Sequence, residues 1–344
     1  MAPLRKNTID TIARKAGVSV STVSRVMNRP EIVREDKRNR VLAVMEELKY
    51  TPSPLARALA TDSLGLIGIM VPNITNQANA RIVYAAMDRL EQSGFRVLLF
   101  DSREDFEREM DIYRSVPKRM IDGIIVIFGN GENADYMELS EGLPVVLAGP
   151  PNLGIPLGKL SSDESEGFRN LIDYLRGLGH RRISFFYGSS VTKGGQRRIR
   201  YFREVMEAFG LECPEELLLD CSWSLEGGYD AADRLLKIED FPTAVIGTSD
   251  QIAIGAMRRF QEEGLSIPGD VSIAGFDNSP MARYVTPSLT SLDFPHAEMG
   301  AKAADLIIAR VRDEASGQDE QIMPLEVVKR ESTAPPAGRG RTQL

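Results

Sequence analysis

The sequence has very few residues of the types that form disulfide frameworks, zinc sites and histidine-based active sites. Its 344 residues include two cysteines, Cys213 and Cys221, and two histidines, His180 and His296. Two cysteines could form one disulfide only marginally, so we interpret both as reduced thiols. Two isolated histidines give no basis for a zinc site or a histidine-based nucleophile triad. We therefore expect neither a metal nor another cofactor.

Long apolar segments are absent as well. The longest apolar runs, such as "GIIVIF" at 123–128, have the length of a strand. They fall far short of the roughly 20 residues of a membrane-spanning helix. The beginning, "MAPLRKNTID", carries basic residues with no apolar stretch after them, so we expect no secretory signal. With 42% hydrophobic and 26% charged residues, we expect a cytoplasmic globular protein of two or three domains without a membrane partner.

What the sequence does have is an uneven distribution of charge. Residues 1–60 contain 12 Lys and Arg against 6 Asp and Glu, whereas the remaining residues contain 30 against 43. A basic segment of this size attracts polyanions, and an acidic remainder suppresses unspecific association. An ordinary charged surface would give the same count, so the order of the residues has to decide between the two interpretations.

The order predicts two short helices joined by a tight turn. In "NTIDTIARKAG" the apolar residues recur at helical spacing, and Gly17 follows where a helix end favours a residue tolerant of positive φ. Ser19 can cap a second helix, "VSTVSRVMN", in which Val23 and Val26 face inward and the polar side chains face outward.

A third helix is predicted over about 34–50, with Val41, Val44 and Leu48 buried against the first two and a stop before Pro52. Three short helices with a polar, short-side-chained second helix describe a helix-turn-helix DNA reader. In such a reader the recognition helix must approach base edges without bulk.

The segment "TIDTIARKAGVSVSTVSRVMN" resembles the signature of the lactose/galactose repressor (LacI-type) family of bacterial transcription regulators, and it continues with "ELKYTPSPLARALAT". The similarity extends through "IDGIIVI", "LGHRRI", "SDQIAIGAM", "IPGDVSIAGFDN" and "PSLTSLDFP". Several motifs in the right order carry the resemblance, whereas any one of them alone would be weak. It implies a DNA-binding head at 1–52, a hinge helix and linker at 53–63, an effector-binding and dimerisation domain at 64–334, and a flexible tail at 335–344.

The resemblance also implies roles for the residues of the second helix. Three residues occupy base-reading positions: Val20, Ser21 and Arg25. Three others lie on phosphates: Thr22, Ser24 and Asn28. The chemistry agrees, because arginine can donate twice to guanine and hydroxyls suit phosphate oxygens. For Arg25 the alternative is a solvated helix face.

Residues 53–60, "SPLARALA", form the next informative segment. Ser53 can cap a helix and Pro54 suits its first position, but two turns are too short to be stable alone. In the family, this hinge helix pairs with that of a second chain in the minor groove and inserts a leucine between base pairs. Leu59 matches that position and Ala56 lies one turn before it. A linker with a chance helical pattern is the alternative.

From residue 64 onward the pattern alternates between strands and helices. Apolar runs such as "LGLIGIMVP", "FRVLLFD", "DGIIVIF", "LPVVLAG", "RRISFFYG" and "TAVIGTS" are separated by amphipathic stretches such as "ARIVYAAMDRLEQSG". This alternation predicts parallel sheets with ligand sites at the carboxyl ends of strands. The resemblance implies an α/β core like that of periplasmic binding proteins, with two parallel-sheet subdomains: about 64–162 with 294–323, and about 163–293 with 324–334.

Two segments resemble motifs of nucleotide-binding enzymes, but neither has the complete pattern. "GNGENA" at 129–134 matches a dinucleotide fingerprint after a strand, but the next strand ends in Gly149 and Pro150 where an acidic residue is needed. "GSSVTKGG" at 188–195 has a lysine and glycines without the spacing of a phosphate-binding loop. We therefore expect no enzyme.

Polar residues that follow strands predict a binding cleft. They are Asn73, Gln77, Asn79, Asp163, Arg198, Trp223, Ser249, Asp250 and Asp277. An indole face with a carboxylate and a guanidinium suits a polar, cyclic small molecule. By the resemblance, Arg198, Trp223 and Asp277 contact the effector, and the positions that vary or shape the pocket are Asn79, Ser249, Phe294 and His296. A core aromatic is the alternative for Trp223, and a structural helix cap is the alternative for Asp277.

Two classes of function remain at this stage. One is a regulator, with a repressor as the expected kind, that binds a palindromic double-stranded DNA operator as a homodimer and responds to a sugar, sugar acid or related polar effector. The other is a sugar-binding transport protein or enzyme with a similar core. The helix-turn-helix head favours the regulator, because a transport receptor needs a signal peptide and has no use for such a head. The sequence leaves open whether the effector releases or promotes DNA binding.

Overall fold

The computed structural model describes residues 8–28, 32–48, 50, 64–116, 118, 120–149, 154–314 and 320–337. The chain divides into two compact units. One contains residues 1–66 and 117–122, and the other, which we call the core, contains residues 67–116 and 123–344.

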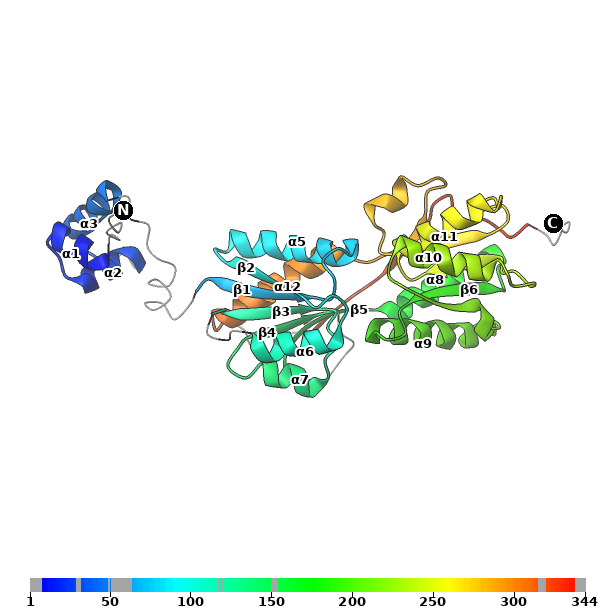
Figure 1. Cartoon of the computed structure of the whole chain (residues 1–344), viewed down its shortest axis with the longest axis horizontal. Coiled ribbons are helices and arrows are strands. Elements are labelled where there is room, and N and C mark those ends of the chain that lie inside the picture. The colour runs from blue at the N-terminus through cyan, green and yellow to red at the C-terminus, as the bar shows by residue number, and fades with distance from the viewer. Residues whose placement is uncertain are drawn as a thin grey trace, which may run out of the picture. The chain divides into compact units, whose positions relative to one another are not determined.

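Three helices make up the head, defined here as residues 8–50 (Figure 1). They are α1 (Ile9–Ala16), α2 (Val20–Asn28) and α3 (Glu35–Glu47). Gly17 ends α1 in the left-handed conformation at φ 67°, and its N–H donates to the carbonyl of Ala13. The hydroxyl of Ser19 accepts the N–H of Thr22 at 3.2 Å at the start of α2. The predicted arrangement of helix, glycine turn and second helix is confirmed.

The head has its own apolar centre, made of Ile12, Ala13, Ala16, Val23, Val26 and Val41. The third helix is shorter than predicted, because it ends at Glu47. Beyond that point the N–H of Tyr50 donates to Met45, which is no longer an α-helical bond. Val44 and Leu48 are half-buried rather than buried, and both pack against this apolar centre. The predicted hinge helix at 53–60, with Ala56 and Leu59, lies outside the described residues.

One half of the core, which we call the N-subdomain, is built on a six-stranded sheet in the order β11-β5-β4-β3-β1-β2. Its strands are β1 (Leu66–Val71), β2 (Arg96–Asp101), β3 (Gly123–Ile127), β4 (Val145–Ala148), β5 (Gly158–Ser162) and β11 (Glu320–Met323). The pairs β1–β3, β3–β4, β4–β5 and β5–β11 are parallel. Its helices are α5 (Gln77–Gln92), α6 (Phe106–Ser115), α7 (Asn133–Leu139) and α12 (His296–Val311).

The other half, the C-subdomain, has a six-stranded sheet in the order β12-β10-β9-β8-β6-β7. Its strands are β6 (Ile183–Gly188), β7 (Leu218–Cys221), β8 (Ala244–Gly247), β9 (Ser272–Phe276), β10 (Thr290–Asp293) and β12 (Glu326–Val328). Only β12 is antiparallel to its neighbour among the pairs described for this sheet. Its helices are α8 (Glu164–Leu178), α9 (Lys193–Ala208), α10 (Leu225–Leu235) and α11 (Asp250–Glu262), and two short 3₁₀ helices are η2 (Glu215–Leu217) and η3 (Pro280–Arg283).

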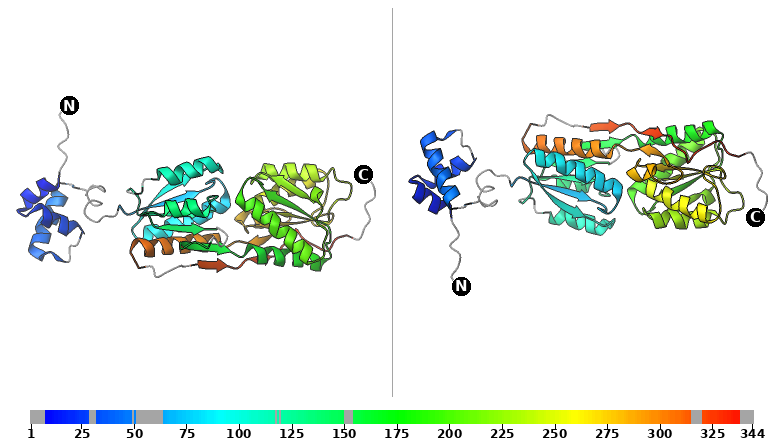
Figure 2. Two further views of the ribbon diagram at one scale, coloured as in Figure 1. Left: turned by 90° about the horizontal axis from the view of Figure 1, so that it is seen from below. Right: turned by 90° about the horizontal axis from the view of Figure 1, so that it is seen from above.

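The chain passes between the subdomains after β5, after β10 and after β11 (Figure 2). The predicted parallel α/β fold is confirmed, and its central strands are apolar because helices cover both faces of each sheet. Figure 2 shows α12 beside α5, although they are far apart in sequence. Gly300 permits this packing, since a Cβ at that position would lie 2.2 Å from the carbonyl oxygen of Ile82.

Candidate functional site

A cavity of about 210 Å³ lies between the two subdomains of the core. A cavity of roughly 150 Å³ accommodates benzene, so this one has room for a ligand with one substituted ring. The N-subdomain contributes Pro72, Asn76, Ala78, Asn79, Glu104, Phe128, Gly129, Asn130, Gly131, Tyr136, Gly149 and His296. The C-subdomain and the crossing after β10 contribute Thr192, Lys193, Gly194, Arg197, Arg198, Trp223, Ser249, Asp277 and Phe294.

Most residues predicted for the effector site line this cavity. They are Asn79, Arg198, Trp223, Ser249, Asp277 and Phe294, together with His296. Asp163 does not line it, because its carboxylate accepts the N–H of Glu166 at 3.0 Å and so caps α8. Asn73 is also outside, while Gln77 and Asp250 line a smaller adjoining pocket.

A buried carboxylate holds two arginines at the cavity wall. Glu164 is 4% exposed, and its Oε1 accepts Nε and Nη2 of Arg198 at 3.1 and 2.8 Å. Its Oε2 accepts Nε of Arg197 at 2.9 Å. Burial alone would raise the pKa of Glu164, but the two guanidinium groups outweigh burial and lower the pKa to about 2. Glu164 therefore stays ionised and balances one of the two arginines.

Arg198 also orders the aromatic side of the cavity. Its Cζ lies 4.2 Å from the ring centre of Phe276 and 5.4 Å from that of Trp223. Trp223 is half-buried, so one part of its indole packs on the core of the C-subdomain while the side chain also lines the cavity. A Cβ at Gly188 would lie 2.0 Å from the indole, so glycine at the end of β6 makes room for this ring. Trp223 is thus a fixed wall of the cavity rather than an entirely buried core residue.

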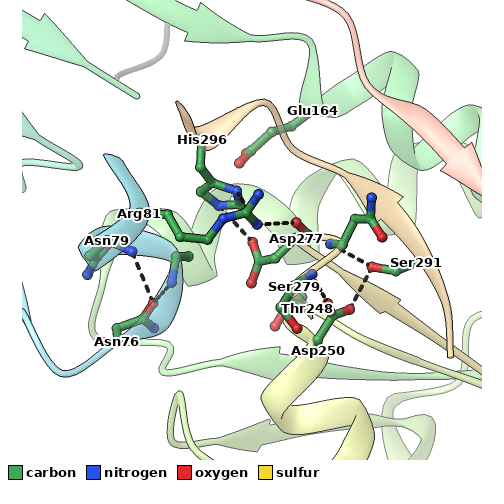
Figure 3. Close-up of polar contacts among 12 residues, drawn as sticks. Asn76, Asn79, Arg81, Glu164, Thr248, Asp250, Asp277, Ser279, Ser291 and His296 are labelled. Carbon is green, nitrogen blue, oxygen red and sulfur yellow. Dashed lines mark hydrogen bonds and ion pairs between the residues drawn. The ribbon is translucent and has the colours of Figure 1, made fainter. Parts of the chain in front are cut away.

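Asp277 lies where the two subdomains approach each other (Figure 3). Its Oδ1 is 3.4 Å from Nε2 of His296, and its carbonyl oxygen accepts Nη1 of Arg81 at 3.3 Å. Figure 3 shows the Arg81 side chain of α5 directed toward both residues. The 3₁₀ helix η3 that follows has Ser279 at its N-cap position. The helix-cap alternative for Asp277 is therefore wrong.

A second aspartate, Asp250, is buried next to Asp277. Its Oδ2 accepts the N–H of Ser279 at 2.5 Å, and its Oδ1 accepts the hydroxyl of Ser291 at 2.6 Å (Figure 3). Burial, followed by the negative charge of Asp277, raises the pKa of Asp250 to about 7. Of these two aspartates, only Asp277 lines the cavity, whereas Asp250 is held by its hydrogen bonds to Ser279 and Ser291.

The loop after β3 was not predicted as part of the cleft. Gly129, Asn130 and Gly131 line the cavity, although their segment had been considered only as a dinucleotide fingerprint. Glu109 of α6 is fully buried and fixes the loop, because its Oε1 accepts the N–H of Asn130 at 2.7 Å. Lys193 of α9 donates to the carbonyl of Gly131 at 2.8 Å. The position of this loop could have indicated its role, because it follows the carboxyl end of a parallel strand, where ligand sites lie.

In the head, the outward face of α2 carries the residues predicted to read DNA. Val20, Ser21 and Arg25 are exposed, whereas Thr22 and Ser24 are half-buried. The opposite face is buried through Val23 and Val26. For Asn28 only the backbone is described, and Ala56 and Leu59 lie outside the described residues.

Two absences concern the described part of the chain alone. Within it, no helix has the length and apolarity that crossing a bilayer requires. The same residues contain no cluster of three or more histidine, cysteine, aspartate or glutamate side chains suited to a metal ion.

Comparison with known proteins identifies both parts of the chain. Residues 8–53 match the bacterial regulatory proteins of the lacI family, and residues 172–333 match a periplasmic binding protein-like domain. The HTH-type transcriptional regulator DegA of Bacillus subtilis (strain 168) is 31% identical over 335 residues, covering 96% of this chain and 99% of DegA. The chain belongs to the lacI family of bacterial regulatory proteins.

Other transcriptional regulators are similar to this chain in sequence or in structure. The HTH-type transcriptional repressor PurR of Vibrio cholerae is 30% identical over 329 residues, covering 94% of this chain and 97% of that protein. The lac repressor dimer bound to operator and the anti-inducer ONPF superposes with a TM-score of 0.85 at 26% identity, over 95% of this chain and 99% of that one. The complex of the regulator CelR with cellobiose gives a TM-score of 0.71 at 26% identity, over 94% and 99%.

These comparisons confirm the predicted fold of a helix-turn-helix head followed by an α/β core of two subdomains. The relatives are transcriptional regulators, and this lacI-family chain is a DNA-binding transcriptional regulator rather than an enzyme. Both the dinucleotide-enzyme and the transport-receptor alternatives are thereby set aside.

Proposed function

We propose that this lacI-family protein is a ligand-responsive repressor that binds a near-palindromic operator as a homodimer and is switched by a small polar effector, such as a sugar or sugar derivative. The observation that carries the proposal is a ring-sized cavity with walls from two subdomains, in a chain that also carries a DNA-reading head. The lac repressor was solved as a dimer with operator and a small molecule, and CelR was solved with cellobiose. A DNA-bound regulator acts in the cytoplasm, where we place this one.

For DNA recognition we assign base contacts to Val20, Ser21 and Arg25. Arg25 is exposed on α2 and can donate twice to guanine O6 and N7. We assign phosphate contacts to Thr22, Ser24 and Asn28, and a minor-groove contact to the hinge residues Ala56 and Leu59. One recognition helix covers one half-site, so two chains are needed for a full operator.

For the effector we assign contacts to Asn79, Arg198, Trp223, Ser249, Asp277 and Phe294. The indole of Trp223 offers a flat apolar face, and the carboxylate of Asp277 accepts from hydroxyl groups. Asn79 belongs to the N-subdomain, whereas Arg198 and Asp277 belong to the C-subdomain. A ligand that contacts both subdomains favours one relative arrangement of the two, and this bias is what an allosteric effector requires.

We divide the chain into four functional segments. They are a DNA-binding domain at 1–52, which contains the head, a hinge helix and linker at 53–63, an effector-binding and dimerisation domain at 64–334, and a tail at 335–344. The effector changes the arrangement of the third segment, and the second segment conveys that change to the head.

The test begins with a thermal-shift screen of the full chain against sugars, sugar acids and nucleobases, because a ligand that binds only the folded state raises the melting temperature. A stabilising ligand is then added during titration of a labelled operator selected from random DNA. We expect operator affinity to change with the ligand, and sedimentation to show a dimer. A monomer that binds a full operator tightly, or a chain that selects no operator, would contradict the proposal.

A further inference from the structure

Arg197 is the residue of the cavity wall whose hydrogen-bonding capacity is least used. Its Nε donates to Glu164, but Nη1 and Nη2 make no hydrogen bond to any residue in the described ranges. The side chain is 13% exposed, and neither terminal nitrogen is among the fully buried atoms that lack a partner, so both are open to solvent. A guanidinium carries four N–H donors on these two nitrogens. The cavity wall therefore presents a donor pair that no described protein group uses.

The charges around Arg197 leave one positive charge in excess. Glu164 is shared by the two guanidinium groups of Arg197 and Arg198, so one carboxylate faces two cations. Arg198 uses the remainder of its bonding on the carbonyl of Thr248 at 2.8 Å. Arg197 has no comparable second partner among the described residues. The uncompensated charge is consequently at Arg197.

The other charged groups of the wall each have a protein neighbour, and Asp277 also lines the cavity. Lys193 is bound to Glu132 at 2.7 Å and to the carbonyl of Gly131. Asp277 faces His296, and Glu104 accepts from Asn73 at 3.1 Å. Neither acidic residue forms a described ion pair with Arg197. The terminal nitrogens of Arg197 are therefore free to donate to a molecule in the cavity.

We propose that the effector is a cyclic monocarboxylic acid of the sugar-acid class, and that Arg197 binds its carboxylate through Nη1 and Nη2. This inference rests on the proposed function of the cavity as the effector site. The planar fork of a guanidinium matches the two oxygens of a carboxylate. A single excess charge suits a monoanion, whereas a phosphate group carries about −1.5 to −2 at neutral pH. Asp277 and Trp223 remain available for the hydroxyl groups and the ring.

Arg197 is a specificity residue in this account, distinct from Arg198. The resemblance to the family assigned effector contact to Arg198 and gave no role to its neighbour. In the structure, Arg198 is bonded to protein atoms through all three of its nitrogens. Arg197 is the one of the two with both terminal nitrogens available.

The experiment measures affinity of the full chain for matched pairs of ligands by calorimetry. The pairs are D-galacturonate with D-galactose and D-glucuronate with D-glucose, with glucuronamide as the uncharged isostere and glucose 6-phosphate as the phosphate arm. We expect at least one acid to bind about tenfold or more tightly than its neutral partner and than the phosphate. A neutral sugar or the phosphate that binds as well as the acids, or failure of both acids to bind, would overturn the inference.

Variants separate a binding role from a structural one. Arg197→Gln should reduce the acid-to-neutral affinity ratio to near one, whereas a merely structural defect would weaken both ligands alike and leave the ratio unchanged. Arg200→Gln is the matched control, because Arg200 lies on the same helix with a side chain 62% exposed and contacts Glu204 and the ring of Tyr201 rather than the cavity. Arg197→Lys retains the charge without the fork and should keep an intermediate ratio. It provides the same readout if Arg197→Gln does not fold.

The outcome can be distinguished from failure of the proposed function. A neutral sugar that binds and changes operator affinity would leave the regulator intact and overturn the carboxylate assignment. A chain that binds the acids but selects no operator would support the carboxylate assignment and overturn the proposed regulatory function.

Discussion

Nη1 of Arg81 lies 3.3 Å from the carbonyl oxygen of Asp277, a residue 196 positions further along the chain. The same nitrogen is 3.4 Å from Nδ1 of His296. Arg81 belongs to α5 of the N-subdomain, and Asp277 follows β9 of the C-subdomain. The contact therefore depends on how the two subdomains of the core are arranged.

Replacement of Arg81 tests whether this contact supports the arrangement of the subdomains that binds the effector. Arg81→Met retains the apolar part of the side chain and removes its donors. Loss of a hydrogen bond of about 0.5 to 1.5 kcal/mol should weaken effector binding roughly two- to tenfold. Arg89→Met is the control, because Arg89 lies on the same helix but contacts Ser93 and Asp305 inside the N-subdomain. Equal affinity losses in both variants, measured by calorimetry, would rule out a specific role for Arg81.

Asp250 gives the protein a stability that depends on pH. Its pKa is raised to about 7 by burial and then by the charge of Asp277, whereas an unfolded aspartate titrates near roughly 3.9. Between these values the folded state binds more protons, so the free energy of unfolding should decrease as the pH rises from about 4 through about 7. The charge of Arg330 interacts with Asp250 and favours its ionised form.

Asp250→Asn removes this titration while an amide can still serve Ser279 and Ser291. Denaturant unfolding at pH 5 to 8 should show the parent losing stability relative to the variant as the pH rises. Asp233→Asn is the control, because hydrogen bonds from Lys237 and Arg259 lower the pKa of that half-buried carboxylate, and it stays ionised over this range. Parallel stability curves for the parent and Asp250→Asn would show that Asp250 does not titrate there.

Arg25 should contribute specificity rather than general affinity. Arg25→Ala should cost about 1 to 3 kcal/mol on the operator and flatten discrimination at one base pair of each half-site. Thr22→Ala is the comparison, because a phosphate contact should weaken specific and random DNA by similar factors. Anisotropy titrations with single-base operator variants measure both effects. Equal losses for Arg25→Ala on operator and random DNA would assign it to the phosphates instead.

Asp277 should determine the affinity for the effector but not the affinity of the ligand-free regulator for DNA. Asp277→Asn keeps the size of the side chain but removes the charged acceptor, so effector affinity should fall by about 1 to 3 kcal/mol. The operator affinity without ligand should stay near that of the parent. Arg198 is less suitable for this test, because its replacement would also weaken the pairing of the buried Glu164. If calorimetry gives Asp277→Asn the same ligand affinity as the parent, the cavity was assigned wrongly.

The sequence predicted six strands from their apolar runs and missed others, including the apolar strands β7 and β9. β3 and β4 are entirely buried and were evident from their β-branched runs. β5 reads "GKLSS", which has no strand pattern, yet Lys159 is buried there with its Nζ 3.5 Å from Glu320 of β11. Its partner comes from a distant part of the chain, so no local pattern could indicate this strand. The same holds for β10, "TSLD".

The residues of the cavity could likewise be predicted only in part from the sequence. Residues at strand ends, such as Ser249 and Asp277, could be predicted from position, because parallel strands present their carboxyl ends at one edge. Asp163 satisfied the same rule but caps a helix. Arg197 was missed, because its place in the wall depends on Glu164, which approaches from another helix.

Trp223 permits the most direct test of the central claim, that occupancy of the cavity changes DNA binding. It is the one tryptophan of the sequence and lines the cavity, so its fluorescence reports on the ligand there. A stabilising ligand is titrated into the protein with a labelled operator, and tryptophan fluorescence and operator anisotropy are recorded in the same solution. We predict that both signals change over the same range of ligand concentration and that Asp277→Asn shifts both midpoints by the same factor. A ligand that saturates the Trp223 signal while operator affinity stays constant would contradict the account.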